Sequence, residues 1–410
     1  MRQSGRLATV LFWLALASPA GAQSADDNWT ACKSLDPATS IGGCSALIDS
    51  REVASTRRAV AYHQRAVAYF KTGLVQRAIE DLDRAVQLNS TYAEAYRDRG
   101  IAYADLHLYD RAIEDFDRAI QIEPNDADAY HSRGLAYFKK GLPDRAIREY
   151  DRSIALNPKN AEVYINRGNA HGDTKRDDLA LQDYEQAISL DPNSAKAYDN
   201  RGNLYDRKGL YDRAMLDYDR AIELDPTNAK AYVNRGTANT HRALYDRALL
   251  DYDRGLALDP TYVLGYLNRG STFVEQGRYD RAIADYDRAI ALDFTSATAY
   301  NNRCWVRMLL KQTEEALTDC DRSLALRPND VETLDSRGFV YLRANQFPAA
   351  IRDFRAAVAL APSQASSRYG LGLAKRLSGD TAGGDADLAA AALLRPGIAA
   401  EFAKYGFTPY

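Results

Sequence analysis

The sequence predicts an all-α protein in which one unit is repeated along more than four fifths of 410 residues. The dipeptide Arg-Gly begins at positions 99, 133, 167, 201, 235, 269 and 337, with Arg303–Cys304 in its place once. This constant spacing indicates a repeat array. At 100° per residue, Tyr232 and Gly236 fall on one face of a helix. Ala248 and Tyr252 do the same on a second helix, so each unit holds two helices. A proline then ends most units, because it has no N–H to continue a helix.

The recurring residues resemble those of the tetratricopeptide repeat. An aromatic residue opens each unit, at Tyr62, Tyr96, Tyr130, Tyr164, Tyr198, Tyr232, Tyr266 and Tyr300. A glycine follows four residues later, then a small residue, a second aromatic and a closing proline. About ten registers from Ala59 to Ile398 follow this pattern. The resemblance implies antiparallel helix pairs, stacked into a right-handed superhelical solenoid whose concave groove binds a peptide segment.

Length and charge favour one elongated domain with protein partners. A chain of 410 residues would ordinarily split into two or three globular domains, but a solenoid extends its core one unit at a time. The net charge is −3, and no run of five or six like charges occurs, so nucleic acid is not an expected partner. The five histidines have no recurring partner at catalytic or metal spacing, so we expect no enzyme, metal or cofactor.

The N-terminus has the pattern of a signal peptide over residues 1–22. Arg2 and Arg6 precede the apolar run 7–17, and residues 20–22 are small. The run is too short to span a bilayer, which takes about 20 residues. We expect cleavage after Ala22, a mature charge of −5 after loss of two arginines from −3, and a periplasmic or secreted protein without a membrane span. A retained anchor is the alternative.

Residues 23–58 are predicted to form a degenerate helix pair that caps the array. Counting back one repeat period from Ala66 and Ala78 gives Cys32 and Cys44. Those are places where paired helices touch, so we predict a disulfide between them, which an oxidising compartment would preserve. Metal binding is the weaker alternative, because no His pair lies nearby.

A second pair of cysteines lies within one later unit. Cys304 replaces the first-helix glycine and Cys320 the second-helix aromatic. Four cysteines allow three connectivities, and the repeat register favours the two local bonds. Two reduced cysteines packed as small apolar groups are the alternative.

The middle units carry Tyr-Asp-Arg-Ala and Asp-Tyr-Asp-Arg strings, as at residues 211–214 and 217–220. Alternating charges usually mark a solvated helix face with weak pairing. We interpret these strings as aids to solubility and inter-unit register.

The candidate binding residues form a ladder two positions after each unit's tyrosine. This position lies about 200° around the helix from the tyrosine and should face the groove. It holds Asn166, Asn200, Asn234, Asn268 and Asn302, and Asn169 and Asn203 lie one turn further along. Amides offer both a donor and an acceptor, which suits the main chain of an extended peptide. The ladder is similar to the asparagine-lined superhelix of the O-linked N-acetylglucosamine transferases, without their catalytic domain. Inheritance from unit duplication is the alternative.

A second resemblance is to the two-carboxylate clamp for acidic C-terminal peptides. Asn169, Asn200 and Lys230 match three of its positions. Ile165 stands where the clamp has a lysine and Asn234 where it has a basic residue, so the pattern departs from the clamp at two places.

Apolar residues replace the ladder further along the chain. Leu267, Trp305 and Phe339 project from the same predicted face, and Phe294 stands where a closing proline is expected. Aromatics gathered on one face are candidate anchors for a partner. The alternative is that Trp305 turns inward to fill space. Residues 59–398 form the predicted array, and 399–410 its cap and tail, with one helix from Ile398 to Tyr405 covering the last apolar face.

These features predict a non-enzymatic scaffold of the bacterial envelope that binds an extended peptide or a partner helix in its groove. The alternative is a structural or self-associating assembly module, or a chaperone, in envelope biogenesis or secretion. Carbohydrate binding along the amide-lined groove is a third hypothesis. The sequence indicates neither the partner nor the oligomeric state.

Overall fold

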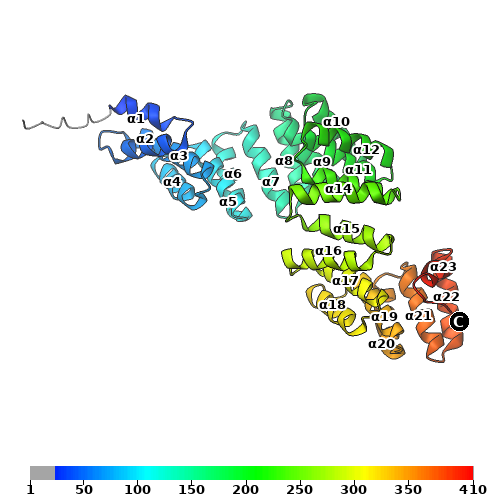
Figure 1. Cartoon of the computed structure of the whole chain (residues 1–410). Coiled ribbons are helices and arrows are strands. Elements are labelled where there is room, and N and C mark those ends of the chain that lie inside the picture. The colour runs from blue at the N-terminus through cyan, green and yellow to red at the C-terminus, as the bar shows by residue number, and fades with distance from the viewer. Residues whose placement is uncertain (1–23, 410) are drawn as a thin grey trace, which may run out of the picture. The chain divides into compact units, whose positions relative to one another are not determined.

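A computed structural model describes residues 24–409 as 23 helices with no strand in that range. The expected signal peptide, 1–22, lies outside the described residues. The chain divides after Leu190 into two compact units, an N-terminal unit and a C-terminal unit, each made of helix pairs (Figure 1). The predicted all-α solenoid of paired helices is therefore confirmed.

The N-terminal unit contains five helix pairs. Its helices are α1 (Ala25–Cys32), α2 (Pro37–Asp49), α3 (Ser55–Lys71), α4 (Val75–Leu88), α5 (Ala93–Asp105), α6 (Tyr109–Ile122), α7 (Ala127–Lys139), α8 (Pro143–Leu156), α9 (Ala161–Asp173) and α10 (Asp177–Leu190).

The C-terminal unit contains six helix pairs and one further helix. These are α11 (Ala195–Arg207), α12 (Tyr211–Leu224), α13 (Ala229–His241), α14 (Tyr245–Leu258), α15 (Val263–Glu275), α16 (Tyr279–Leu292), α17 (Ala297–Leu309), α18 (Thr313–Leu326), α19 (Val331–Arg343), α20 (Phe347–Leu360), α21 (Ala365–Leu377), α22 (Thr381–Leu394) and α23 (Ile398–Ala403).

The odd-numbered helices of each unit form one continuous face. Within a unit the backbone of each odd-numbered helix closely approaches that of the next odd-numbered one, whereas no such approach joins two even-numbered helices among the described residues. We call the surface made by the odd-numbered helices the first-helix face. It is the face on which the predicted groove residues fall.

Seven repeats close on a contact between a glycine and an aromatic ring. A Cβ on Gly134 would lie 2.6 Å from the Tyr150 ring, so only glycine permits this approach. The disulfide between Cys304 and Cys320 occupies the same two positions, with Cα atoms 5.5 Å apart. A ring is thus replaced by a covalent link.

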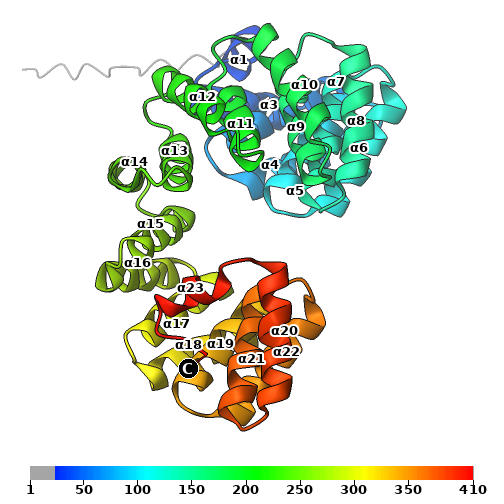
Figure 2. The same cartoon turned by 90° about the vertical axis from the view of Figure 1, so that its right-hand side faces the viewer.

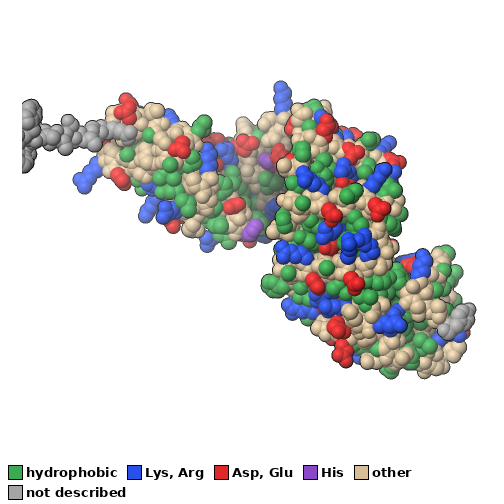
Figure 3. Space-filling view, viewed as in Figure 1, with side chains coloured by type: hydrophobic (Ala, Val, Ile, Leu, Met, Phe, Trp, Pro, Cys, Tyr) green, Lys and Arg blue, Asp and Glu red, His purple; other side chains and the backbone are tan. Residues whose placement is uncertain are grey.

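In most repeats an arginine ties two even-numbered helices together. Arg269 donates from Nε and Nη2 to Asp285 at 2.8 and 2.6 Å in its own repeat, and from Nη1 to Asp253 of the preceding repeat at 2.6 Å. Asp285 is buried, and Asp253 is exposed. In each Asp-Tyr-Asp-Arg string the first aspartate, such as Asp285, is therefore buried, and its interpretation as part of a solvated face is wrong. The second aspartate, such as Asp253, is exposed and links adjacent repeats through the arginine, as expected for a role in repeat register. The face shown in Figure 3 carries acidic and basic side chains interspersed in both units.

The N-terminal helix pair is linked by a disulfide. Cys32 at the end of α1 and Cys44 in α2 are bonded and fully buried. Helix α2 packs on α3, the first helix of the next pair.

Candidate peptide-binding site

The ladder asparagines bind the preceding repeat. Asn234 Nδ2 donates to Asp199 Oδ1 at 2.9 Å, and Asn268 Nδ2 donates to Thr237 Oγ1 at 3.0 Å. Burial raises the pKa of Asp199, and the bond from Asn234 opposes that rise. The side-chain N–H groups of these asparagines therefore hold neighbouring repeats in register. The repeat period alone did not reveal that their bonding partners lie in the preceding repeat.

Two other ladder positions follow the same pattern and contact the preceding repeat. In the N-terminal unit, Asn166 is buried and its Nδ2 lies 2.9 Å from His131 Nε2. In the C-terminal unit, Asn302 bonds the hydroxyl of Tyr286, and Asn200 is half-buried. Asn166 is thus too enclosed to meet a peptide main chain as predicted.

The two asparagines one turn along from the ladder accept bonds from the second helix. The Tyr184 hydroxyl donates to Asn169 Oδ1, and the Tyr218 hydroxyl donates to Asn203 Oδ1, both at 2.8 Å. Buried tyrosine hydroxyls need such partners. Asparagine and tyrosine are separated by 15 residues in both repeats. This constant spacing is the feature of the sequence from which the bond between the two side chains could have been predicted. Lys230, by contrast, is exposed.

The predicted aromatic anchors are covered by the protein's own C-terminal segment, residues 398–407. Phe339 is 0% exposed, so its prediction as an accessible groove residue is wrong. Its ring stacks on Phe402 of α23 with centroids 4.7 Å apart, and Trp305 makes edge contacts with Phe339 and Tyr405 at 5.8 and 5.5 Å. Leu267 is half-buried against a separate cluster around Phe273.

The C-terminal segment lies on the first-helix face. Helix α23 ends at Ala403, earlier than expected, and Figure 2 shows it turned back beside α17 and α19. Arg343 of α19 donates to the backbone oxygen of Tyr405 and lies 4.7 Å over the Phe407 ring. The Tyr369 hydroxyl of α21 donates to the Phe407 oxygen at 3.3 Å. The segment therefore spans three repeats.

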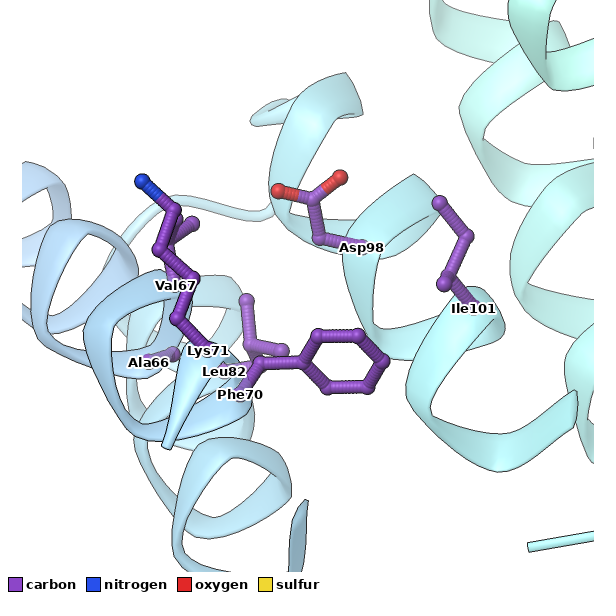
Figure 4. A pocket seen from close by; sticks show the side chains of 7 residues that line it. All are labelled: Ala66, Val67, Phe70, Lys71, Leu82, Asp98 and Ile101. Carbon is purple, nitrogen blue, oxygen red and sulfur yellow. The ribbon is translucent and has the colours of Figure 1, made fainter. Parts of the chain in front are cut away.

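The N-terminal unit has an open pocket on its first-helix face. It has a volume of about 210 Å³. Its lining comes from α3, α4 and α5 and consists of Ala66, Val67, Phe70, Lys71, Leu82, Asp98 and Ile101. Figure 4 shows the Phe70 ring reaching from α3 toward Ile101, with the Lys71 amine and the Asp98 carboxylate on the same side above it. Sequence reasoning missed this pocket.

A polar chain supports the wall of this pocket. Asp98 Oδ2 lies 2.7 Å from His63 Nε2, and His63 Nδ1 lies 2.9 Å from the Tyr92 hydroxyl. Burial raises the pKa of Tyr92 to about 12, so this hydroxyl stays protonated at neutral pH. The three groups satisfy one another. No group of three or more His, Cys, Asp or Glu side chains in residues 24–409 could hold a metal ion.

Comparisons with known proteins agree on one repeat family. Models described as TPR repeat match residues 66–106, 109–141 and 270–303, and models described as tetratricopeptide repeat match 131–195, 195–228, 217–249 and 299–393. A search of the curated proteins finds no match.

Solved structures share the fold. A tetratricopeptide repeat protein from Parabacteroides merdae is 20% identical with a TM-score of 0.51, covering 60% of this chain and 98% of that chain. The APC/C hetero-tetramer Cut9–Hcn1 is 15% identical with a TM-score of 0.54, covering 93% of this chain and 90% of that chain. At such identities the likeness shows fold alone.

Proposed function

The chain belongs to the tetratricopeptide repeat family, whose fold supports protein–protein contacts, and from this premise we propose that it binds a short helical segment of a partner on its first-helix face. The binding is non-catalytic and rests on apolar anchors. An extended peptide along the asparagine ladder is a secondary mode, since those amides already hold neighbouring repeats together.

The observation that carries the proposal is the docking of residues 398–407 on this face. Ile398, Phe402 and Phe407 are buried there, although α23 has only six residues. A helix that short is not stable by itself in water. Helix α23 is therefore ordered by its contacts with the first-helix face. This supports the proposal that a helical segment of a partner binds the face through the same kind of apolar contacts.

We place the protein in the bacterial envelope, as a periplasmic or secreted scaffold. Its two disulfides fit an oxidising compartment. No helix between residues 24 and 409 is long and apolar enough to cross a membrane. An assembly or chaperone module in envelope biogenesis or secretion remains the alternative function, and it would use the outer, even-numbered helices.

The test is release and rebinding of the C-terminal segment. A protease site placed between Arg395 and Gly397 lets the unit fold with its tail before cleavage. With Trp29 replaced by Phe, Trp305 is the tryptophan of the described residues that reports on the face. Cleavage and removal of the tail should red-shift its emission, and a peptide of residues 397–409 should reverse the shift in a saturable way.

The matched control is the same peptide with Phe402→Ala and Phe407→Ala, which should not bind. A cleaved unit that keeps its helical circular dichroism but leaves Trp305 unchanged after peptide addition would refute the proposal. A ladder test is separate: Asn200→Ala, Asn234→Ala and Asn268→Ala together should leave this rebinding intact if the apolar anchors dominate.

A further inference from the structure

We propose that the pocket of the N-terminal unit binds an aromatic side chain, presented by a short helical segment of another protein that carries an acidic residue beside it. The inference rests on the proposed function and names the site and the partner chemistry. It concerns a part of the first-helix face that the C-terminal segment does not cover.

The repeat register identifies what fits the pocket. A whole number of repeat periods separates the pocket from the tail-covered cluster of the C-terminal unit. Val67 thereby corresponds to Trp305, and Ile101 to Phe339. In the C-terminal unit these positions contact Phe402. The same positions of the same fold thus meet an aromatic ring in one unit and form an open cavity in the other.

The cavity has room for such a ring. At the two corresponding positions the N-terminal unit has the smaller residues, Val67 and Ile101, in place of tryptophan and phenylalanine. The resulting volume is about 210 Å³. An apolar cavity of roughly 150 Å³ is already sufficient for benzene. The pocket therefore has the volume for one aromatic ring.

The charged side chains at the mouth of the pocket favour a particular residue next to the bound aromatic. Asp98 is occupied by its contact with His63, whereas the Lys71 side chain is exposed at the rim. An acidic residue next to the aromatic would meet Lys71, and the C-terminal segment has this order in Glu401 and Phe402. The protein's own segment is buried in its own unit, so the natural occupant comes from a different chain.

The experiment uses the full chain with its tail docked and its disulfides intact. The probe is a fluorescein-labelled peptide of residues 397–409, and its anisotropy is measured against protein concentration. Saturable binding is expected. Ile101→Glu should weaken it by about tenfold or more, because an apolar wall becomes charged, and tenfold is about 1.4 kcal/mol. Leu106→Glu is the matched control, since Leu106 is 40% exposed and Ile101 37%, and only Ile101 lines the pocket.

A second variant guards against misfolding. Val67→Asp places a charge on the other apolar wall of the pocket, so binding should again fall about tenfold. Lys71→Glu should weaken binding chiefly at low salt. Binding that is absent in the full chain, or unaffected by both Ile101→Glu and Val67→Asp, would overturn the inference. Rebinding at Trp305 in the cleaved protein would still support the proposed function, so the two failures are distinguishable.

Discussion

Replacing Phe402 with alanine should release the C-terminal segment while the repeats stay folded. Phe402 is 4% exposed, stacks on Phe339 and lies 5.3 Å from the Tyr369 ring. Truncating a phenylalanine buried to this extent costs about 3–5 kcal/mol. Because α23 is too short to persist undocked, the loss should appear as local opening of the segment.

Hydrogen exchange measures this opening residue by residue. A local cost of this size should speed exchange of the α23 amides on the order of 10²- to 10⁴-fold, while α17 and α19 keep their protection. Phe294→Ala is the control, because Phe294 is 68% exposed and its truncation should change little. Unchanged exchange of α23 in the Phe402→Ala protein would show that Phe402 does not hold the segment, and the reasoning would fail.

Three further predictions concern stability. Arg269→Met should lower the free energy of unfolding of its repeats by about 3–5 kcal/mol, because the Asp285 carboxylate stays buried without its cation. Adding Asp285→Leu should recover most of that loss, and urea unfolding measures both effects. Replacing Cys32 and Cys44 by serine should cost about 3 kcal/mol, seen as faster exchange of α1 and α2. Burial raises the pKa of Asp335 to about 6, above its value of about 3.9 in an unfolded chain. The folded state therefore holds that proton more tightly, and stability of the C-terminal unit should fall as pH rises from about 4 to about 6; Asp335→Asn should flatten this dependence.

The fold followed from the sequence because its main contacts repeat with the chain's own period. The contact between Gly134 and Tyr150 has a counterpart in six other repeats, so the spacing alone indicated where helices meet. The buried ion pairs have the same regularity, with 16 residues between Arg269 and Asp285. That spacing was available in the sequence, but the charge strings also fit a solvated surface, and only packing shows which carboxylate is inside.

The site was harder to predict because the decisive contacts are not periodic. Phe339 is enclosed by residues 398–407, which lie far along the chain from it, and no repeat rule links them. The ladder amides bond residues one repeat back, as Asn234 does with Asp199. Such bonds depend on how far adjacent helices stagger, which the period does not determine.

The departures from the repeat explain why the C-terminal segment docks where it does. In the repeat of α17 and α18, Cys320 stands in place of the second-helix aromatic, so the core loses a ring that would bury roughly 150–250 Å². The disulfide to Cys304 supplies a cross-link of about 3 kcal/mol in the chain-entropy model but little apolar area. Phe402 of the segment belongs to one buried cluster with both cysteines, and Trp305, next to that disulfide, is half-buried against the same cluster. The lost aromatic packing is thus restored from the first-helix face, by Trp305 and by Phe402 of the C-terminal segment.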